Sequence, residues 1–263
     1  MYAMKTNQEG GFMKRTIIGF LLMAILWLPY QVLAETKTVT LATGDWEPYT
    51  SKDMENFGTF TEIVSAVFKE VGIEPNYKFV PWKRAEQQTE AGNFFAAFPY
   101  IITEERKQGF DFSDRVMFST GRFFYNKKYS PQGISYNKFE DLAPYTISGV
   151  RGYWYEKPFK EAKLNVDYVN ADTQSFQKLF VNRVQLAASD ELVGWALIKS
   201  LYPQEVAQFA IVEKPMNQDD LRLMVSRKYP NAQELTKKFN AAMESIRKKG
   251  IVSQILAKHG VKE

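Results

Sequence analysis

The sequence predicts an α/β fold that is divided into two lobes. Segments with strand patterns alternate with segments of helical spacing, and this alternation is typical of largely parallel sheets covered by helices. The alternation restarts after residue 125, so that one chain contains two such series. No low-complexity stretch or long linker separates them, and we therefore expect two lobes joined by short crossing segments.

The first series begins with a strand over residues 38–43, where polar and apolar side chains alternate. A turn at residues 44–49 follows. Apolar residues at helical spacing then predict a helix over residues 60–71, which Gly72 ends. A strand, a helix and a buried strand complete the series at residues 77–80, 82–91 and 94–98.

The second series repeats this order of elements. Its expected strands are residues 145–150, 166–169 and 184–188, and its expected helices begin near Trp154, Asp172 and Asp190. The chain then closes with a strand over residues 221–226 and an amphipathic helix over residues 231–249. Short crossing segments near residues 123–127 and 221–226 would serve as the hinge.

The N-terminal region has the order of features that is typical of a secretory signal peptide. A basic start at residues 13–15 precedes an apolar run over residues 16–28, and Val32-Leu33-Ala34 offers small or apolar residues for cleavage. We predict a signal peptide within residues 1–34, with 13–34 as the true signal. The apolar run is shorter than the ~20 residues that span a bilayer, which makes a membrane anchor the weaker alternative. The mature chain is therefore expected in the periplasm.

Composition argues against several classes of function. The 263-residue chain has a net charge of +4 with basic and acidic residues interspersed, so nucleic-acid binding gains no support. It contains no cysteine and a single histidine, His259, which removes Ser-His-Asp and Cys-His catalysis and His-rich metal sites. No phosphate-binding glycine loop is present. Most common enzyme classes are thereby closed off, and we expect no enzyme, no metal and no cofactor.

One stretch carries a resemblance to a known family. Thr103-Glu104-Glu105-Arg106, followed by Phe110-Asp111-Phe112-Ser113, is similar to the T-x-x-R and D-F-S motifs of the bacterial extracellular solute-binding proteins of family 3. These proteins are the polar amino acid receptors of ABC importers. Other matches, in the same order, cover nearly all of residues 36–260. The sequence departs from the motif at Arg115, where the family has proline.

The resemblance implies a periplasmic-binding-protein type II fold with two lobes, a hinge and a ligand cleft between the lobes. Lobe 1 would comprise residues 36–122 plus 221–263, and lobe 2 residues 123–220. The protein would capture a small polar solute, an amino acid or a related compound, and deliver it to the membrane permease of an ABC-type importer. The sequence gives no sign of an oligomer interface, and we expect a monomer.

The resemblance also implies roles for three residues. In the family, an arginine at the position of Arg106 binds the carboxylate of the ligand, an aspartate at the position of Asp190 accepts its ammonium group, and an aromatic residue at the position of Trp46 packs over it. Each residue has a structural alternative. Arg106 would be a surface residue paired with acidic neighbours, Asp190 a helix N-cap, and Trp46 a core residue.

Four further residues are candidates for ligand contact: Tyr100, Arg151, Gly152 and Tyr153. The small polar residues that the family places before the T-x-x-R turn are replaced by Phe98-Pro99-Tyr100-Ile101. The threonines that follow Arg-Gly in the family are replaced by residues 153–155, which are all aromatic. An aromatic-rich cleft favours a bulky, flat or cationic ligand through stacking and cation–π contacts.

Two other functions stay open on the same fold. The protein could be a free periplasmic sensor that signals through a separate partner. It could also be a cyclohexadienyl dehydratase-like enzyme, which would need a carboxyl group in the cleft as a general acid with a raised pKa. Glu47 and Glu191 are the candidates for that role.

Overall fold

The computed structural model describes residues 1–3 and 37–261. The chain divides into two compact units, Met1–Thr36 and Lys37–Glu263, and the fold described below is that of the second unit. The predicted signal peptide at residues 13–34 lies outside the described residues. In the part of the chain that the structure describes, no helix has both the length and the apolar character needed to cross a membrane.

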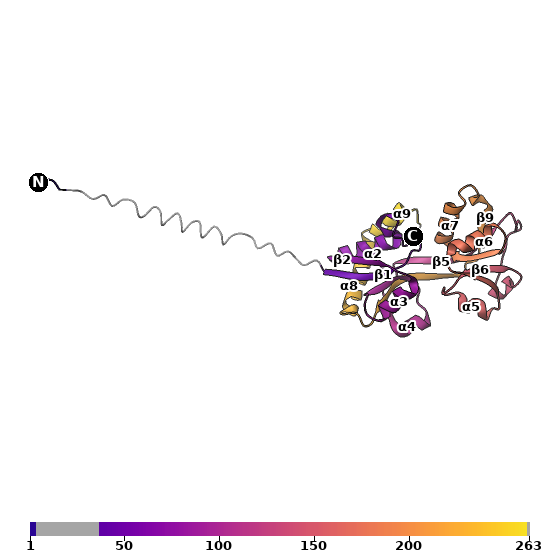
Figure 1. Ribbon diagram of the computed structural model, residues 1–263, viewed down its shortest axis with the longest axis horizontal. Coiled ribbons are helices and arrows are strands. Elements are labelled where there is room, and N and C mark those ends of the chain that lie inside the picture. Colours follow the sequence, from indigo (N-terminus) through magenta and orange to yellow (C-terminus); the bar gives the residue numbers. More distant parts are fainter. Residues whose placement is uncertain (4–36, 262–263) are drawn as a thin grey trace. The chain divides into compact units, whose positions relative to one another are not determined.

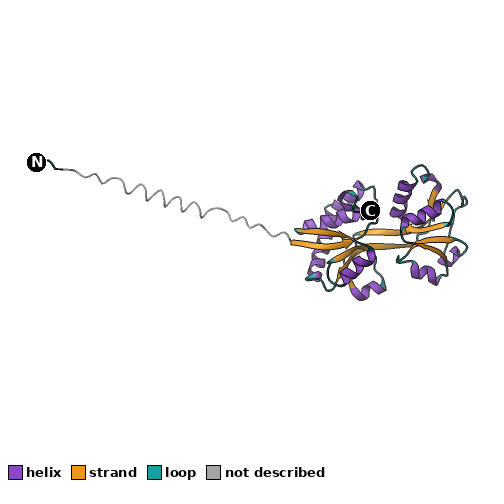
Figure 2. Cartoon of the chain, viewed as in Figure 1, coloured by secondary structure: helices purple, strands orange, loops and turns teal. Residues whose placement is uncertain are grey.

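Strands and helices alternate along the second unit, as Figures 1 and 2 show. The strands are β1 (Lys37–Thr43), β2 (Ile73–Phe79), β3 (Ala96–Tyr100), β4 (Phe110–Phe112), β5 (Met117–Asn126), β6 (Thr146–Val150), β7 (Asn165–Val169), β8 (Leu186–Asp190), β9 (Phe209–Ile211) and β10 (Asn217–Ser226). The α-helices are α2 (Thr59–Glu70), α3 (Trp82–Glu90), α4 (Glu104–Gly109), α5 (Glu156–Glu161), α6 (Asp172–Phe180), α7 (Glu191–Leu201), α8 (Ala232–Lys248) and α9 (Ile251–Lys258). Short 3-10 helices are η2 (Glu55–Phe57), η3 (Phe139–Leu142) and η4 (Val206–Gln208).

The strands form a sheet in the order β2-β1-β3-β10-β5-β8-β6-β7, to which β4 and β9 add at β10 and β5. At one end of this order β1 is parallel to β2 and β3, and at the other end β6 is parallel to β7 and β8. The central pairs that involve β5 and β10 are antiparallel. The predicted α/β fold with two series of parallel strands is confirmed.

Buried side chains gather into separate cores on the two halves of the sheet. We call the clusters built from residues 39–117 and 221–256, to which Val193 is added, the first core. The clusters built from residues 123–212 are the second core. Large aromatic side chains dominate both; Phe60 and Phe98 stack in the first and Phe123 and Phe159 in the second. Helices α2, α8 and α9 pack against one another beside the first core.

Two long strands connect the regions of the two cores (Figure 2). β5 and β10 pair there in an antiparallel ladder that runs from Met117↔Leu221 to Gly121↔Asn217. Phe123 and Phe124 already belong to the second core, so the crossing lies earlier in β5 than residues 123–127. The predicted lobe boundaries, after residues 122 and 220, fall inside these two strands. Their role as a hinge remains a prediction.

Candidate functional site

The carboxyl ends of β1 and β3 lie side by side, because both strands are parallel neighbours in the sheet. Gly44, which follows β1, lies against the Trp82 ring so closely that a Cβ there would be 2.7 Å from the ring. The Trp82 ring meets Tyr100 at the end of β3 edge-on, with centroids 5.9 Å apart, and the Trp82 carbonyl accepts a hydrogen bond from the Tyr100 hydroxyl (3.2 Å). Ligands of α/β proteins bind at such strand ends.

Arg106 extends this aromatic pair with a positive charge. The α4 helix begins after Thr103, whose hydroxyl accepts a hydrogen bond from the Arg106 backbone N–H (3.2 Å). The half-buried Arg106 side chain turns back toward β3: its Nη1 donates to the Ile101 carbonyl (3.2 Å), and its guanidinium carbon lies 4.7 Å from the centroid of the Tyr100 ring. Two fixed contacts therefore hold the guanidinium in one orientation.

Two acidic neighbours of Arg106 are engaged elsewhere. Glu104 pairs with Lys107 (2.6 Å), and Asp111 pairs with Arg227 (2.8 Å). Within residues 37–261, Arg106 itself has an ion pair with no carboxylate. The structural alternative of a surface arginine paired with its acidic neighbours is therefore not what these residues form. A planar guanidinium with free N–H donors is suited to a carboxylate, which it can bind through two parallel hydrogen bonds.

Trp46 and Tyr49 form a second aromatic pair, on the turn after β1. Their rings stack with centroids 4.6 Å apart, and Trp46 packs against the first core. The indole Nε1 of Trp46 is buried without a hydrogen-bond partner among the described residues. Because buried indole N–H groups usually find an acceptor, this donor is a candidate for a contact with a bound molecule.

The Tyr49 hydroxyl reaches across the molecule to Asp190, at the end of β8, and donates to both carboxylate oxygens (3.1 and 3.2 Å). Asp190 also caps α7, accepting the backbone N–H groups of Leu192 (2.9 Å) and Val193 (3.2 Å), and it accepts the Ser119 hydroxyl (2.7 Å). Its N-cap alternative is thus present in the structure. Four donors about fill the lone pairs that a carboxylate offers.

Burial sets the electrostatics of Asp190. Removal from water disfavours the charged form and raises the pKa of Asp190 to about 6, although its hydrogen bonds act in the opposite direction. Burial also raises the pKa of Tyr49, and the neighbouring Asp190 carboxylate raises it further because ionisation beside a negative charge is unfavourable. Tyr49 therefore remains a hydroxyl donor at neutral pH.

Asp172 is a second enclosed carboxylate, which the sequence singled out only as the beginning of a helix. It follows β7 and accepts the Tyr153 hydroxyl (2.7 Å) and the Ser189 hydroxyl (3.1 Å). Burial raises the pKa of Asp172. The chain turns sharply at Gly152, whose φ of 80° favours glycine, and this turn precedes Tyr153. The position of Asp172 between a predicted strand and a predicted helix was the signal that could have identified it.

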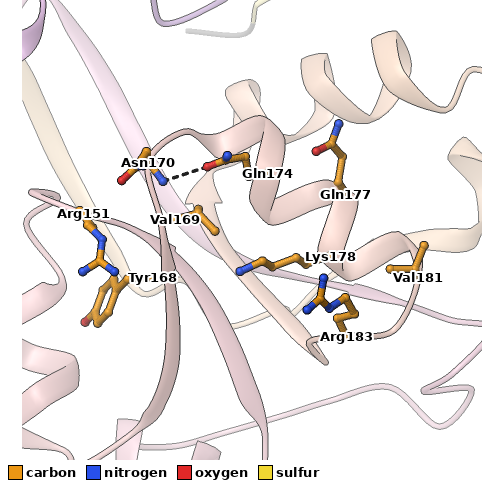
Figure 3. A pocket seen from close by; sticks show the side chains of 9 residues that line it. All are labelled: Arg151, Tyr168, Val169, Asn170, Gln174, Gln177, Lys178, Val181 and Arg183. Atoms are coloured by element: carbon orange, nitrogen blue, oxygen red, sulfur yellow. Dashed lines mark hydrogen bonds between the residues drawn. The ribbon is translucent and has the colours of Figure 1, made fainter.

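Arg151 lies in a different environment from Arg106 and Asp190. It is exposed, and its guanidinium carbon is 5.8 Å from the centroid of the Tyr168 ring. It lines a pocket formed only by residues 151–183 (Figure 3). Within the described residues, no hydrogen bond, ion pair or ring contact joins Arg106, Asp190 and Arg151 to one another.

The two candidates for a general acid are both engaged by other side chains. Glu191 pairs with Arg122 (2.8 Å), and Glu47 accepts the Ser51 hydroxyl (2.9 Å).

His259 lies beside Glu62 (2.7 Å) on the helices of the first core. The described part of the chain contains no group of three or more side chains that could hold a metal ion.

Comparison with known protein families identifies the family of this chain. Residues 39–262 match the family model of the bacterial extracellular solute-binding proteins, family 3. The chain belongs to this family. Its role is therefore that of a solute-binding protein, and its fold is the periplasmic-binding-protein type II fold. No curated protein matches the sequence.

Among solved structures, this family 3 protein is similar to an ancestral arginine-binding protein bound to arginine, with 25% identity and a TM-score of 0.69 over 84% of this chain and 97% of the other. It is also similar to an ancestral amino acid-binding protein described as a precursor of cyclohexadienyl dehydratase (22%, TM-score 0.66, 83% and 94%). A histidine kinase sensor domain with similarity to periplasmic binding proteins shares the fold at 17% identity (TM-score 0.68, 83% and 95%). The family and most of these structures are binding proteins.

Proposed function

We propose that this protein is the periplasmic binding component of an ABC-type importer and captures a small polar solute that carries a carboxylate, an amino acid or a related compound, without chemical change. The observation that carries the proposal is the Arg106 guanidinium, which is held by Tyr100 and the Ile101 carbonyl and has no acidic partner within the described residues. A ligand carboxylate would supply the missing negative charge.

The solute would be enclosed between two sets of strand ends. Trp46 follows β1, Tyr100 ends β3 and Arg106 comes soon after it. On the other side, Gly152 and Tyr153 follow β6, and Asp190 ends β8. A hinge movement at the β5–β10 ladder would bring the two sets together around the ligand and exclude water, which strengthens each polar contact.

The contacts of Asp190 affect whether it can bind the ammonium group of an amino acid. Because Asp190 already accepts four donors, an ammonium group would have to displace the Tyr49 hydroxyl to reach it. Asp172 accepts only the Tyr153 and Ser189 hydroxyls in the described residues and has lone pairs left for a cationic group. We therefore propose that the contact between Arg106 and the ligand carboxylate contributes most to binding. Either Asp190 or Asp172 would bind the ammonium group.

A ligand screen tests this function. Residues 35–263 are examined by thermal shift with amino acids, amines, aromatic acids and short peptides, and each hit is then measured by calorimetry. Arg106→Ala should weaken binding of the hit at least 100-fold, because it removes two charge-assisted hydrogen bonds. Lys107→Ala is the matched control: Lys107 is the next residue of α4, is exposed and pairs with Glu104. Equal affinities of the Arg106 variant and the wild type would reject the proposed contact.

A dehydratase is the second candidate, because Asp190 is a buried carboxyl group whose pKa is raised to about 6, the direction that a general acid requires. Incubation with prephenate distinguishes the two functions. Release of an aromatic product that Asp190→Asn abolishes would establish the enzyme. Binding of prephenate without turnover would support the solute-binding role.

A further inference from the structure

A pocket on the second half of the molecule lies between the edge strand β7 and helix α6 (Figure 3). Its cavity volume is about 570 Å³, which is within the usual size of small-molecule sites. All the residues that line it fall between Arg151 and Arg183, so the pocket is formed without any residue of the first core. In Figure 3, Arg151 and Tyr168 lie on one side of Val169, and Lys178 and Arg183 lie on the other.

The lining is cationic. Arg151, Lys178 and Arg183 contribute three positive charges, and no lining residue is acidic. Asp167, next to the pocket, accepts a hydrogen bond from Lys178 (2.7 Å) and neutralises that one charge. Burial raises the pKa of Tyr168 and the nearby Glu156 raises it further, but Glu156 does not line the pocket. The guanidinium groups of Arg151 and Arg183 form no ion pair within residues 37–261.

Neutral donors accompany these cations. The Gln174 side chain accepts the Asn170 backbone N–H through its Oε1 (3.0 Å), which leaves its amide N–H groups free to donate. The Gln177 side chain projects from the next turn of α6 (Figure 3). Tyr168 supports Arg151 through its ring face. Guanidinium and amide donors around one cavity form the donor set that binds carboxylate and phosphate oxygens.

We propose that this pocket is a second ligand site, separate from the solute site at Arg106, and that it binds a small anion with two or more negative charges, either a polycarboxylate or a phosphate compound. Two ends of the cavity attract negative charge: the guanidinium of Arg151 lies at one end and that of Arg183 at the other (Figure 3). One anionic group can bind at each end, and a singly charged anion would satisfy only one of them.

Titration with citrate, pyrophosphate and acetate at constant ionic strength tests the site. Calorimetry and amide chemical shifts of the wild-type chain should show saturable binding of citrate, pyrophosphate or both, with shifts concentrated in residues 151–183, and no saturation by acetate. A preference between the first two distinguishes a polycarboxylate from a phosphate ligand. Each of Arg151→Gln and Arg183→Gln should weaken binding about tenfold, since each removes one charge-assisted contact.

Lys199→Gln provides the matched control, because Lys199 is an exposed cation of α7 that does not line the pocket. It should leave the affinity unchanged, and so should Arg106→Ala, which tests the other site. The proposal is overturned if neither polyanion saturates the protein at millimolar concentration. It is also overturned if Lys199→Gln weakens binding as much as Arg183→Gln, because the attraction would then come from net charge alone.

Discussion

Asp190 illustrates how one residue combines structural and electrostatic roles. Its carboxylate caps α7, ties that helix to Tyr49 of the first core, and remains shielded from water. Charging it is therefore costly despite its hydrogen bonds, and its pKa rises from 3.8 to about 6. The folded state consequently holds a proton on Asp190 in a pH range where the unfolded chain has released it.

This difference predicts a pH dependence of stability. Because the folded pKa lies above the unfolded value, the contribution of Asp190 to the free energy of unfolding is largest below pH ~4 and falls as the pH rises toward 6. The loss is on the order of 3 kcal/mol for a pKa that rises from 3.8 to about 6. Asp190→Asn keeps an N-cap and cannot titrate. Urea unfolding of both proteins from pH 4 to 7 should show the wild type losing stability relative to the variant; parallel curves would contradict the assignment.

At the level of elements, helix α7 packs closely against strand β5 because glycine, a poor helix former, lies at the contact. Gly194 of α7 lies over the buried Phe124 ring of β5, and a Cβ on Gly194 would be only 2.2 Å from the Phe124 Cζ. Alanine is the better helix former by about 1 kcal/mol. Overpacking a buried aromatic ring costs more than that, typically about 1–3 kcal/mol.

We therefore predict that Gly194→Ala lowers the free energy of unfolding, against its helix propensity. Phe124→Leu replaces the ring with a smaller side chain, so Gly194→Ala should cost less in the Phe124→Leu background. A double-mutant cycle by denaturant unfolding measures this coupling, which should exceed about 0.5 kcal/mol. Additive effects of the two substitutions would show that the helix and strand move apart freely.

The sequence predicted the order of the helices and strands well, but it placed two strands wrongly. Hydrophobic periodicity predicted the strand–helix order because burial imposes it locally, and α2 begins within one residue of the predicted helix. The last strand of each series, however, lies two residues later than expected, at Ala96–Tyr100 and Leu186–Asp190. Phe94 and Phe95 looked like strand residues because they are apolar, but strand ends depend on pairing with neighbours distant in sequence. The engagement of Asp190 by Tyr49 is likewise set by residues 141 positions apart, which no local pattern contains.

On the scale of the whole second unit, the β5–β10 ladder is the main covalent and hydrogen-bonded link between the regions of the two cores. Strand pairs of this kind can flex without unfolding either core, which makes ligand-dependent closure measurable. The absence of cysteine from the sequence allows spin labels to be placed at chosen positions alone.

We predict that labels at Gln87→Cys on α3 and Lys160→Cys on α5, both exposed positions, approach each other by more than about 2 Å when the solute from the screen binds. Double electron–electron resonance measures this distance. Labels at Gln87→Cys and Gln233→Cys, which lie on α3 and α8 beside the first core, should keep their separation. An unchanged α3–α5 distance in the saturated protein would mean that binding occurs without closure.

The return of β10 to the first core also dictates when each half of the molecule can be finished. The second core is built from the continuous stretch 123–212, whereas the first core needs residues 39–117 together with residues 221–256. A chain that emerges N-terminus first, from a ribosome or a translocation channel, can thus complete the second core while the first is still missing α8 and α9. Until then β3 has an open edge where β10 will pair, and exposed edges invite association with other chains. Residues 39–117 are therefore synthesised first, but the core to which they belong is completed last.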